Sequence, residues 1–367
     1  MTELRLEKTV MGRRGGFRPE MVGLRRRMLG FSQGELEAST GISQAAISKI
    51  EQGLREPSPE QIDKFAQALN CLDSFFFQAE REYGPPISAH PMYRKKASVG
   101  QKVLDKVIAE LSVRLGHARV LLQSVDFEPE LKLPHYDADD YASCIEDVAD
   151  MVRRAWYVPR GPIRSLIEFV ERAGILVILS DMDAARIDGV SYQVAGMPPV
   201  IFLNRNLPAD RQRFSLAHEL GHLVLHSFPT PEMEQQADQF AAAFLMPRED
   251  IASELKDMTL AKAAQLKPFW RVSMGSLIFR ASTLGKIDSG SSSYLWRQMA
   301  VRGFRTREPA SLDFPSEKPT LANALFTNLI EAMGYTNEDL ERSLHLSFNE
   351  IAELYGLKPA PGLRRVK

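Results

Sequence analysis

The chain has 367 residues, of which 44% are hydrophobic and 25% are charged, the composition of an ordinary globular protein with room for two or three cores. Its formal net charge of −1 excludes a uniformly basic nucleic-acid binder, so any attraction to phosphate must be local. No apolar run approaches the roughly 20 residues that a membrane-spanning helix needs, and the first residues form no signal peptide, so we expect no membrane contact and a cytoplasmic location.

The N-terminal segment carries a local excess of positive charge. Residues 1–30 contain eight Lys or Arg residues against three Glu residues, an excess of five. DNA phosphates respond to such a local excess, whatever the charge of the whole chain. Residues 1–17, which include the run Met11-Gly-Arg-Arg-Gly-Gly16, are predicted to form a basic flexible arm. This arm either lies on DNA or is a solvated tail without function.

Residues 18–83 have the pattern of a small helical bundle. Three helices are predicted over residues 20–30, 32–41 and 44–53, and a fourth over 58–69 closes the bundle. Ser32 begins the second helix with Glu35 three residues on, and Ser43 precedes the third helix; both are signals of a helix start. Two short helices joined by a glycine-containing turn form a helix-turn-helix.

This bundle resembles the DNA-binding domain of the Xre/Cro family. The resemblance is carried by Leu24-Arg-Arg-Arg-Met-Leu-Gly-Phe-Ser-Gln33 and Ser43-Gln-Ala-Ala-Ile-Ser-Lys-Ile-Glu-Gln-Gly53. It implies that the third helix enters the major groove of a double-stranded operator, where Gln44 reads an adenine edge. It also implies a phosphate contact from Gln33 and a structural pair between Arg26 and Glu51. The implied DNA-binding residues are Gln33, Ser43, Gln44, Ala45, Ser48 and Lys49. Since repressors of this kind bind two half-sites with two subunits, we expect a homodimer.

Residues 84–130 are predicted to form a linker and a long helix. The run Tyr83-Gly-Pro-Pro-Ile-Ser-Ala-His-Pro-Met-Tyr93 is rich in Pro and Gly, and a helical pattern follows from Val99 to about Val125. This helix either packs on the following domain or mediates dimerisation.

Three short runs upstream of residue 205 have the composition of β-strands. They are Gly174-Ile-Leu-Val-Ile-Leu179, Gly189-Val-Ser-Tyr-Gln-Val194 and Val200-Ile-Phe-Leu203, separated by Asp, Gly and Pro. We predict three antiparallel strands, whose edge strand can pair with an extended substrate backbone. Tyr192 either donates a hydrogen bond to a reaction intermediate or is a strand residue with no catalytic role.

His218-Glu219-Leu220-Gly221-His222 is the most informative stretch of the chain. The surrounding apolar residues, from Phe214 to Leu225, have the spacing of an amphipathic helix. Residues four apart on a helix project from the same face, so both imidazoles are within reach of one metal ion, with a carboxylate beside the first. This is the arrangement that removes a proton from a zinc-bound water and hydrolyses a peptide bond.

A catalytic zinc needs a third protein ligand. His226 is excluded because it lies eight residues beyond His218, about 12 Å along a helix axis. A second helical run extends from Glu232 to Met246, and a short loop would return Glu234, near its start, to the histidine face. We favour Glu234, and Glu232 and Asp238 remain competitors. A cysteine ligand is disfavoured because neither Cys71 nor Cys144 belongs to a C-x-x-C motif.

These two helical runs resemble the ImmA/IrrE family of bacterial metallo-endopeptidases. The matching residues are Phe214-Ser-Leu-Ala-His-Glu-Leu-Gly-His-Leu-Val-Leu-His226, Glu234-Gln-Gln-Ala-Asp-Gln-Phe-Ala241 and Phe244-Leu-Met-Pro247. The resemblance implies His218, His222 and Glu234 as ligands of one Zn²⁺ per chain and Glu219 as general base. It also implies a peptide substrate, typically a helix-turn-helix repressor. Because this ligand set also accepts Mn, Fe or Co, the metal is left open beyond zinc. The peptidase-like domain is predicted over residues 131–288.

Residues 289–367 are predicted to form a helical C-terminal interaction region. Ser289-Gly-Ser-Ser-Ser293 has the composition of a flexible break. Two short helices, at 337–343 and 348–354, look like half of a helix-turn-helix. Their five acidic residues against one arginine make a poor phosphate binder, so we interpret this pair as protein-facing.

The predicted fold is multidomain and mainly α. An all-α helix-turn-helix bundle is followed by an α+β zincin-like metallopeptidase domain with a small antiparallel sheet and then by a helical C-terminal region. The favoured function is a bacterial or phage transcriptional regulator whose zinc endopeptidase cleaves a repressor, either itself or a partner. The first alternative is a repressor or antitoxin whose metallopeptidase-like domain is a ligand sensor without turnover. The second is a purely structural use of the fold in assembly.

Overall fold

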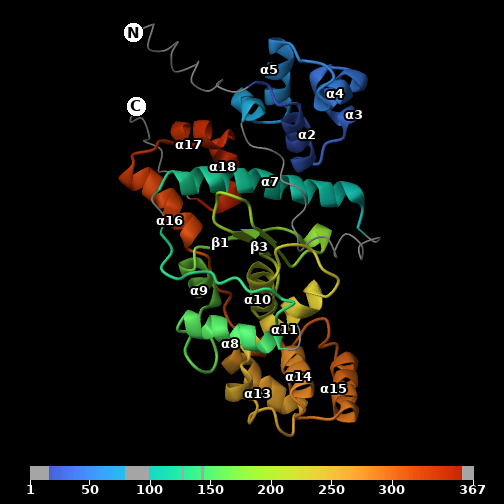
Figure 1. Ribbon diagram of the computed structural model, residues 1–367. Helices are drawn as coiled ribbons and strands as arrows, with labels where there is room; N and C mark the ends of the chain where they lie inside the picture. The colour runs from blue at the N-terminus through green and yellow to red at the C-terminus, as the bar shows by residue number, and fades with distance from the viewer. Residues whose placement is uncertain (1–15, 79–98, 126–127, 142–143, 358–367) are drawn as a thin grey trace, which may run out of the picture. The chain divides into compact units, whose positions relative to one another are not determined.

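The computed structural model describes residues 16–78, 99–125, 128–141 and 144–357 (Figure 1). The chain divides into two compact units, one formed by residues 1–85, 97–127 and 322–367 and the other by residues 86–96 and 128–321. Most of the predicted basic arm and the Pro-rich linker lie outside the described residues. The five segments predicted from the sequence are more finely divided than these two units, and their boundaries stay a prediction.

The first unit contains the predicted helix-turn-helix bundle. The Ser32 hydroxyl accepts a hydrogen bond from the Glu35 amide, and the Glu35 carboxylate accepts one from the Ser32 amide, so the predicted cap is present. Gly41 ends the second helix at a φ of 70°, a left-handed conformation that glycine adopts without a steric penalty. The elements are α2 (Pro19–Met28), α3 (Gln33–Thr40), α4 (Gln44–Glu51), α5 (Pro59–Ala68) and the 3-10 helix η2 (Asp73–Phe77).

An ion pair ties the first helix of this bundle to the end of its third helix. Arg26 donates from Nε to Glu51 Oε1 at 2.6 Å and from a terminal nitrogen to Glu51 Oε2 at 2.9 Å. Both side chains are largely buried, and a two-point contact between planar groups sets the angle between helices as well as their distance. The predicted structural pair is therefore confirmed, and it positions α4 relative to α2.

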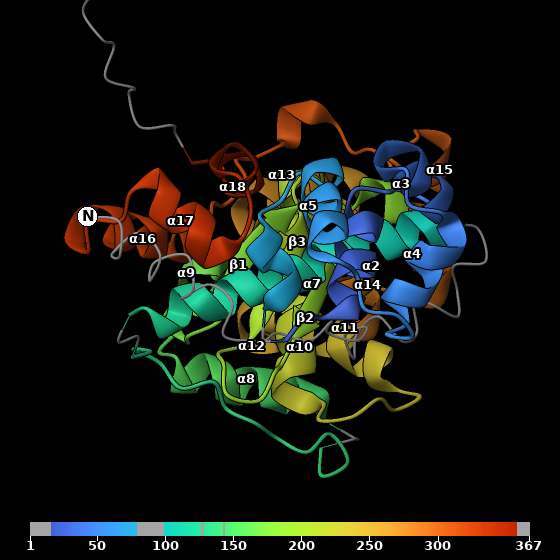
Figure 2. The ribbon, with the colours of Figure 1, turned by 90° about the horizontal axis from the view of Figure 1, so that it is seen from above.

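The C-terminal helices of the first unit pack on the long helix of the same unit. The predicted long helix is α7 (Gln101–Gln123), and on it His117 lies 3.0 Å from the Leu344 carbonyl oxygen and 3.0 Å from the Tyr355 hydroxyl. The helix pair predicted near residues 337–354 is thus present, with its buried face on this chain's own helix (Figures 1 and 2). The elements are α16 (Leu321–Thr327), the π-helix η6 (Asn328–Ala332), α17 (Asn337–Leu344) and α18 (Phe348–Tyr355).

A buried arginine joins α2 to α18. Arg25 has no solvent exposure, and its two terminal nitrogens donate to the two carboxylate oxygens of Glu350, each at 2.6 Å. Its remaining donors reach the backbone carbonyls of Leu69 and Asn70 at 3.0 and 2.9 Å. Because a buried charge without partners costs several kcal/mol, this arginine requires the C-terminal helices to stay docked on the bundle.

The second unit is built around a three-stranded sheet in the order β1-β3-β2. β3 pairs in parallel with β1, with Leu176 opposite Val200, and antiparallel with β2, with Tyr192 opposite Val200. The prediction of three antiparallel strands is therefore correct for one pair and wrong for the other. The connection between β1 and β2 returns the chain to the far side of β3. The strands are β1 (Leu176–Ser180), β2 (Gly189–Tyr192) and β3 (Val200–Asn204).

Two helices of the second unit pack unusually closely. A side chain at Gly221 would place its Cβ 3.1 Å from the Phe240 ring and 3.3 Å from the Ala237 Cα, so only glycine allows this approach. The two helices are α10 (Ala209–Leu225) and α11 (Met233–Leu245), and together with β2 and β3 they enclose part of the core (Figure 1).

Further helices complete the second unit. The stretch Ser289–Ser293, predicted as a flexible break, is instead the first part of a helix; that prediction is wrong. The Asp288 carboxylate accepts hydrogen bonds from the Ser291 amide and hydroxyl and so caps a segment whose serines alone favour no helix. The remaining elements are α8 (Ile145–Ala155), α9 (Leu166–Arg172), η4 (Asp183–Ala185), α12 (Arg248–Ile251), α13 (Leu260–Trp270), α14 (Met274–Thr283), α15 (Ser289–Val301) and η5 (Ala310–Leu312).

The predicted fold class is confirmed, with the sheet mixed rather than wholly antiparallel. A helix-turn-helix bundle near the N-terminus is followed by an α+β domain, and helices dominate both units. None of the helices within the described ranges is both long and apolar enough to cross a bilayer.

The buried pair between Arg25 and Glu350 generates a stability prediction. Glu350→Ala leaves the guanidinium buried without its carboxylate and is expected to lower the free energy of unfolding by about 3 kcal/mol. Urea denaturation followed by circular dichroism measures this loss. Glu353→Ala, an exposed position on the same helix, is the matched control and is expected to change stability by less than about 0.5 kcal/mol. Equal losses in the two variants would contradict the assigned role of the pair.

Candidate metal centre and nucleic-acid interface

Helix α10 brings the two histidines of the H-E-x-x-H motif together. The Nε2 atoms of His218 and His222 lie 3.0 Å apart, and the rings meet edge to face with centroids 4.7 Å apart. His222 is 3% exposed and His218 is half-buried, so the shared side of the rings is shielded from bulk water. Both imidazoles thus aim the same nitrogen at one point.

Helix α11 supplies a carboxylate to that point. Glu234, in the first turn of this helix, has one oxygen 3.3 Å from His222 Nε2 and the other 3.8 Å from His218 Nε2. A tetrahedral zinc ion with bonds of about 2.0–2.1 Å holds its ligand atoms about 3.3–3.4 Å from one another. The spacing of these three groups fits such an ion.

Hydrogen bonds on the far side of each ring leave the converging nitrogens as acceptors. His218 Nδ1 lies 2.8 Å from Asp238 Oδ1, so this nitrogen carries the hydrogen. His226 Nε2 donates to Gln236 Oε1 at 2.9 Å, which leaves His226 Nδ1 to accept from His222 Nδ1 at 3.1 Å. In this assignment both Nε2 atoms point bare lone pairs at the same place, as metal-bound histidines do.

The charges around the site favour a cation. Burial alone lowers the pKa of His218, but the hydrogen bond to Asp238 and the charges of Glu219, Asp238 and Glu234 outweigh it and raise this pKa. Burial lowers the pKa of His226 to about 4, so this imidazole is neutral at pH 7. Its hydrogen bond to Gln236 places the hydrogen on Nε2, so its Nδ1 is an acceptor for His222. The site as a whole therefore stabilises positive charge at the converging nitrogens.

Glu219 is held beside the histidines by strand β2. The residue is 4% exposed, and its Oε2 accepts a hydrogen bond from the Ser191 hydroxyl at 2.7 Å. A side chain at Gly189 would place its Cβ 3.1 Å from the Glu219 Cγ, so glycine at this strand position leaves room for the glutamate. Glu219 and both imidazoles have ligand atoms within 4.8 Å of one another.

Four acidic residues were candidates for a role at this centre, and the geometry separates them. Glu219 also lies near the imidazoles, but its contact with Ser191 holds it to the strand, whereas Glu234 reaches 3.3 Å from His222. Asp238 contacts the outer nitrogen of His218. Glu232 is exposed at the N-cap of α11, and within the described residues it forms no ion pair with either imidazole. Of these four residues, Glu234 is the one whose carboxylate oxygens lie 3.3 Å from His222 Nε2 and 3.8 Å from His218 Nε2.

Sequence reasoning missed two residues that shape this centre and the role of a third. Ser191 and Gln236 belong to no motif that was assigned a role, and His226 was considered only as a zinc ligand, not as the hydrogen-bond partner of His222. The helical spacing carried one usable signal, because His226 lies four residues beyond His222 and therefore on the same face. No such signal identified the partner of Glu219. Ser191 is 28 residues away, and its contact with Glu219 forms only because β2 packs on α10.

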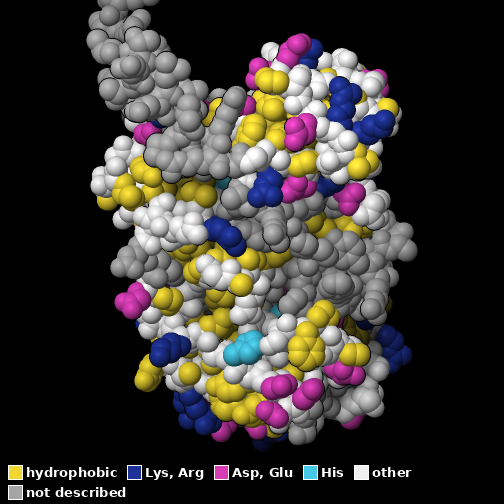
Figure 3. Space-filling view, turned by 45° about the horizontal axis from the view of Figure 1, so that its top comes forward, with side chains coloured by type: hydrophobic (Ala, Val, Ile, Leu, Met, Phe, Trp, Pro, Cys, Tyr) yellow, Lys and Arg dark blue, Asp and Glu magenta, His cyan; other side chains and the backbone are white. Residues whose placement is uncertain are grey.

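In the first unit, α4 presents the predicted DNA-reading residues to solvent. Gln44, Ala45 and Lys49 are exposed and Ser48 is partly exposed, while Ile47 and Ile50 are buried in the bundle. The Ser43 hydroxyl caps the helix by accepting from the Ala46 amide at 3.4 Å. On the described part of the face in Figure 3, basic side chains lie in small groups among acidic ones. Affinity for DNA would thus depend on a local surface.

Gln33 lies next to the pair that orients α4. Its Nε2 donates to Glu51 Oε2 at 2.9 Å, the oxygen that also accepts from Arg26. The side chain is half-buried in the first turn of α3. A phosphate contact from Gln33 stays a prediction.

Comparison with known proteins identifies both modules. Residues 24–74 match a helix-turn-helix family, and residues 170–282 match the peptidase M78 family through its IrrE N-terminal-like domain. No curated protein matches the chain. The chain therefore combines a segment that matches an Xre-like helix-turn-helix domain with a segment that matches the IrrE/ImmA-like domain of the peptidase M78 family.

Proposed function

We propose that this DNA-binding regulator carries a metal-dependent endopeptidase that cleaves a helix-turn-helix repressor, either a partner protein or another copy of this chain. The observation that supports it most is the convergence of two histidine Nε2 atoms and the Glu234 carboxylate beside a buried Glu219. The two family matches support the pairing of DNA binding with a peptidase-type domain.

The three converging side chains would hold one divalent cation, for which zinc is the best fit. His218, His222 and Glu234 form a two-nitrogen, one-oxygen set, and Mn, Fe or Co are the alternatives that such a set accepts. A cation bound there supplies Lewis-acid polarisation of the scissile carbonyl and makes water more acidic. Asp238 and His226 keep the two imidazoles in the tautomer that binds metal.

Glu219 is proposed as the general base. Its carboxylate accepts a proton from the attacking water and then gives it to the leaving amine, so no net charge is left on the protein. The hydrogen bond from Ser191 to Oε2 orients the carboxylate throughout, which makes Ser191 a positioning residue. Low exposure of Glu219 keeps competing water from its proton.

The edge of the sheet offers a place for the peptide backbone. β2 is an edge strand, and its Ser191 is the residue that contacts Glu219. An extended peptide that pairs with β2 would therefore pass the general base, with main-chain hydrogen bonds independent of the peptide sequence. The remaining role of Tyr192, which is buried and packs edge to face on Phe202, is structural in this proposal.

The DNA-binding half of the proposal places α4 in the major groove of an operator. Gln44 reads an adenine, Lys49 and Gln33 contact phosphates, and Ser43, Ala45 and Ser48 lie along the same groove. Two copies of the chain would bind the two half-sites as a homodimer. Action on DNA and on a repressor is expected in the cytoplasm.

The alternative is that the peptidase-type domain senses a ligand without turnover. The buried, serine-bound Glu219 argues against it, because a sensor has no need to keep a carboxylate desolvated beside the metal ligands. A substitution that removes only the charge of the Glu219 carboxylate distinguishes a peptidase from a ligand sensor.

Glu219→Gln is expected to keep about one metal ion per chain and to lose cleavage by about 10²–10⁴-fold, because the amide cannot accept the water proton. Metal content is measured by mass spectrometry of the purified protein, and cleavage by following candidate repressors and the chain itself on gels. Equal cleavage and equal gene control in wild type and variant would contradict the peptidase proposal and support the ligand sensor.

The metal affinity of three α11 variants tests the ligand assignment. Glu234→Ala is expected to cause the largest loss, and Asp238→Ala a loss of about 10–100-fold because the His218 tautomer is no longer held. Glu232→Ala is the matched control on the same helix and is expected to leave affinity unchanged. Competition with a chromophoric chelator gives the dissociation constants. If Glu232→Ala weakens binding more than Glu234→Ala, the third ligand is misassigned.

Gln44→Ala is expected to weaken operator binding by about 1–3 kcal/mol, because a bidentate contact to one base is lost. The operator is first selected from a random duplex library with the wild-type chain, and affinity is then measured by fluorescence anisotropy at fixed salt. Gln67→Ala on exposed α5 is the control, and Glu219→Gln is expected to bind DNA as wild type does. Normal binding by Gln44→Ala would show that α4 is not the reading helix.

A further inference from the structure

A cavity in the second unit is assigned no role by the proposed function. It has a volume of about 480 Å³ and lies between the N-terminal half of α10, α11, α14, α15 and the segment 304–308. Pockets for small molecules in proteins have volumes of roughly 300–1,000 Å³. The cavity is therefore large enough for a compact organic molecule.

The walls of the cavity are mainly apolar and aromatic. Phe279 is 52% exposed although it lines the cavity, and an exposed aromatic side chain of this size is an energetic cost that a bound molecule would remove. Trp296 has two close neighbours: a Cβ at Gly275 would lie 3.2 Å from an edge atom of its ring, and the Arg305 guanidinium lies over the ring, 5.3 Å from its centroid. The aromatic lining consists of Phe214, Phe279, Trp296 and Phe304.

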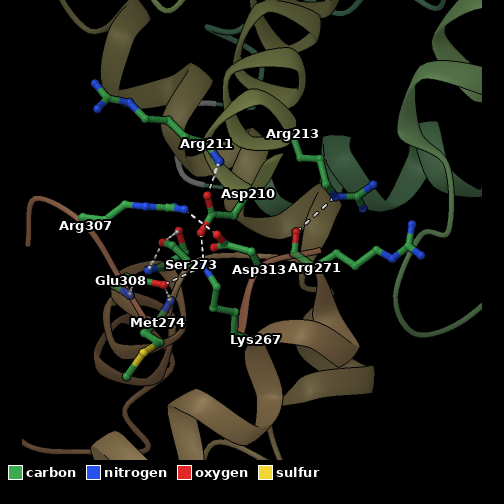
Figure 4. A network of polar contacts seen from close by, with 12 residues as sticks. Asp210, Arg211, Arg213, Lys267, Arg271, Ser273, Met274, Arg307, Glu308 and Asp313 are labelled. Carbon is green, nitrogen blue, oxygen red and sulfur yellow. Dashed lines mark hydrogen bonds and ion pairs between the residues drawn. The ribbon is translucent and has the colours of Figure 1, made fainter. Parts of the chain in front are cut away.

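The charged groups at the floor satisfy one another. Lys267, 1% exposed, reaches both Asp210 of α10 and Glu308, and these contacts keep its pKa raised although burial lowers it (Figure 4). Glu308 also accepts hydrogen bonds from the Met274 and Gly275 amides at 3.1 and 3.2 Å, at the start of α14. The floor therefore holds the helices around the cavity. Because one lysine faces two carboxylates, it keeps a net formal charge of −1, so an anionic group of a ligand would have to lie away from the floor.

One cation at the cavity has no acidic partner. Arg211 pairs with Asp188 at 2.7 Å, and Arg307 pairs with Asp313. Arg305 stacks on Trp296, and among the residues that the structure describes no carboxylate lies within 4.0 Å of it. Because an exposed guanidinium binds carboxylates in a planar two-point contact, this residue is suited to an anionic group at the mouth of the cavity.

We propose that this cavity is a binding site for a small aromatic carboxylate, whose ring lies among Phe279, Phe304 and Trp296 and whose carboxylate pairs with Arg305. The apolar walls provide affinity for the ring, and Arg305, which pairs with no carboxylate of the described residues, selects a negatively charged ligand. The site also borders Asp238, the residue that contacts His218, but the proposal does not depend on metal binding or on cleavage.

Isothermal titration of the full-length chain with 2-naphthoate tests the proposal. We expect saturable binding at one site per chain, and binding of the neutral 2-naphthamide that is at least about ten-fold weaker, since the charged contact is lost. Arg305→Glu is expected to weaken 2-naphthoate binding by about ten-fold or more. Phe279→Asp, at an exposed wall position, is expected to weaken both probes because it places charge against the ring.

Arg302→Glu is the matched control. It changes the net charge by the same amount, is exposed at the end of α15 and does not line the cavity, so 2-naphthoate affinity is expected to stay within a factor of two. Glu219→Gln is likewise expected to bind the probe as wild type does, which separates this site from the peptidase proposal. Absence of binding at millimolar 2-naphthoate, equal affinity for the two probes, or equal effects of Arg305→Glu and Arg302→Glu would each overturn the assignment.

Discussion

The approach of the His218 and His222 Nε2 atoms to 3.0 Å is the contact on which the proposed site of the second unit depends. Two imidazole nitrogens this close need a proton or a cation between them, and the carboxylates around them provide the field that favours that positive charge. The close approach of α10 and α11 at Gly221 brings Glu234 within reach. The site therefore depends on how α10 packs against α11. It also depends on the position of the edge strand β2, because Ser191 of that strand contacts Glu219.

Each unit contains a buried cationic side chain that is surrounded by several hydrogen-bond acceptors. Arg25 in the first unit and Lys267 in the second each contact more than one acceptor from elements distant in the sequence. A buried charge with a complete set of partners specifies which elements must meet, because any other arrangement leaves it unpaired. In the first unit this joins α18 to the helix-turn-helix bundle, and in the second it joins α10, α13 and the start of α14.

The proposed metal centre and the proposed ligand cavity share one side chain. Asp238 holds the His218 tautomer on one side and borders the cavity on the other. If both sites are occupied as proposed, any effect of the ligand on metal affinity must be matched by an equal effect of the metal on ligand affinity. A regulator that binds DNA, a metal and a small molecule would have a physical link between the last two through this carboxylate.

Local sequence by itself determined the helix-turn-helix, the H-E-x-x-H helix and the pair of helices near the C-terminus, because caps, apolar spacing and motif residues are all within a few positions of one another. It also directed attention to Glu234, since a short loop leaves few ways to fold back. Only the tertiary structure decided the parallel pairing of β1 with β3, the contact of Ser191 with Glu219 and the place of Arg25 beside Glu350. The helix at Ser289 is different, because its Asp288 cap is a local signal that the sequence analysis overlooked. The other three depend on contacts between residues far apart in the chain, and no local pattern encodes which distant partner will be there.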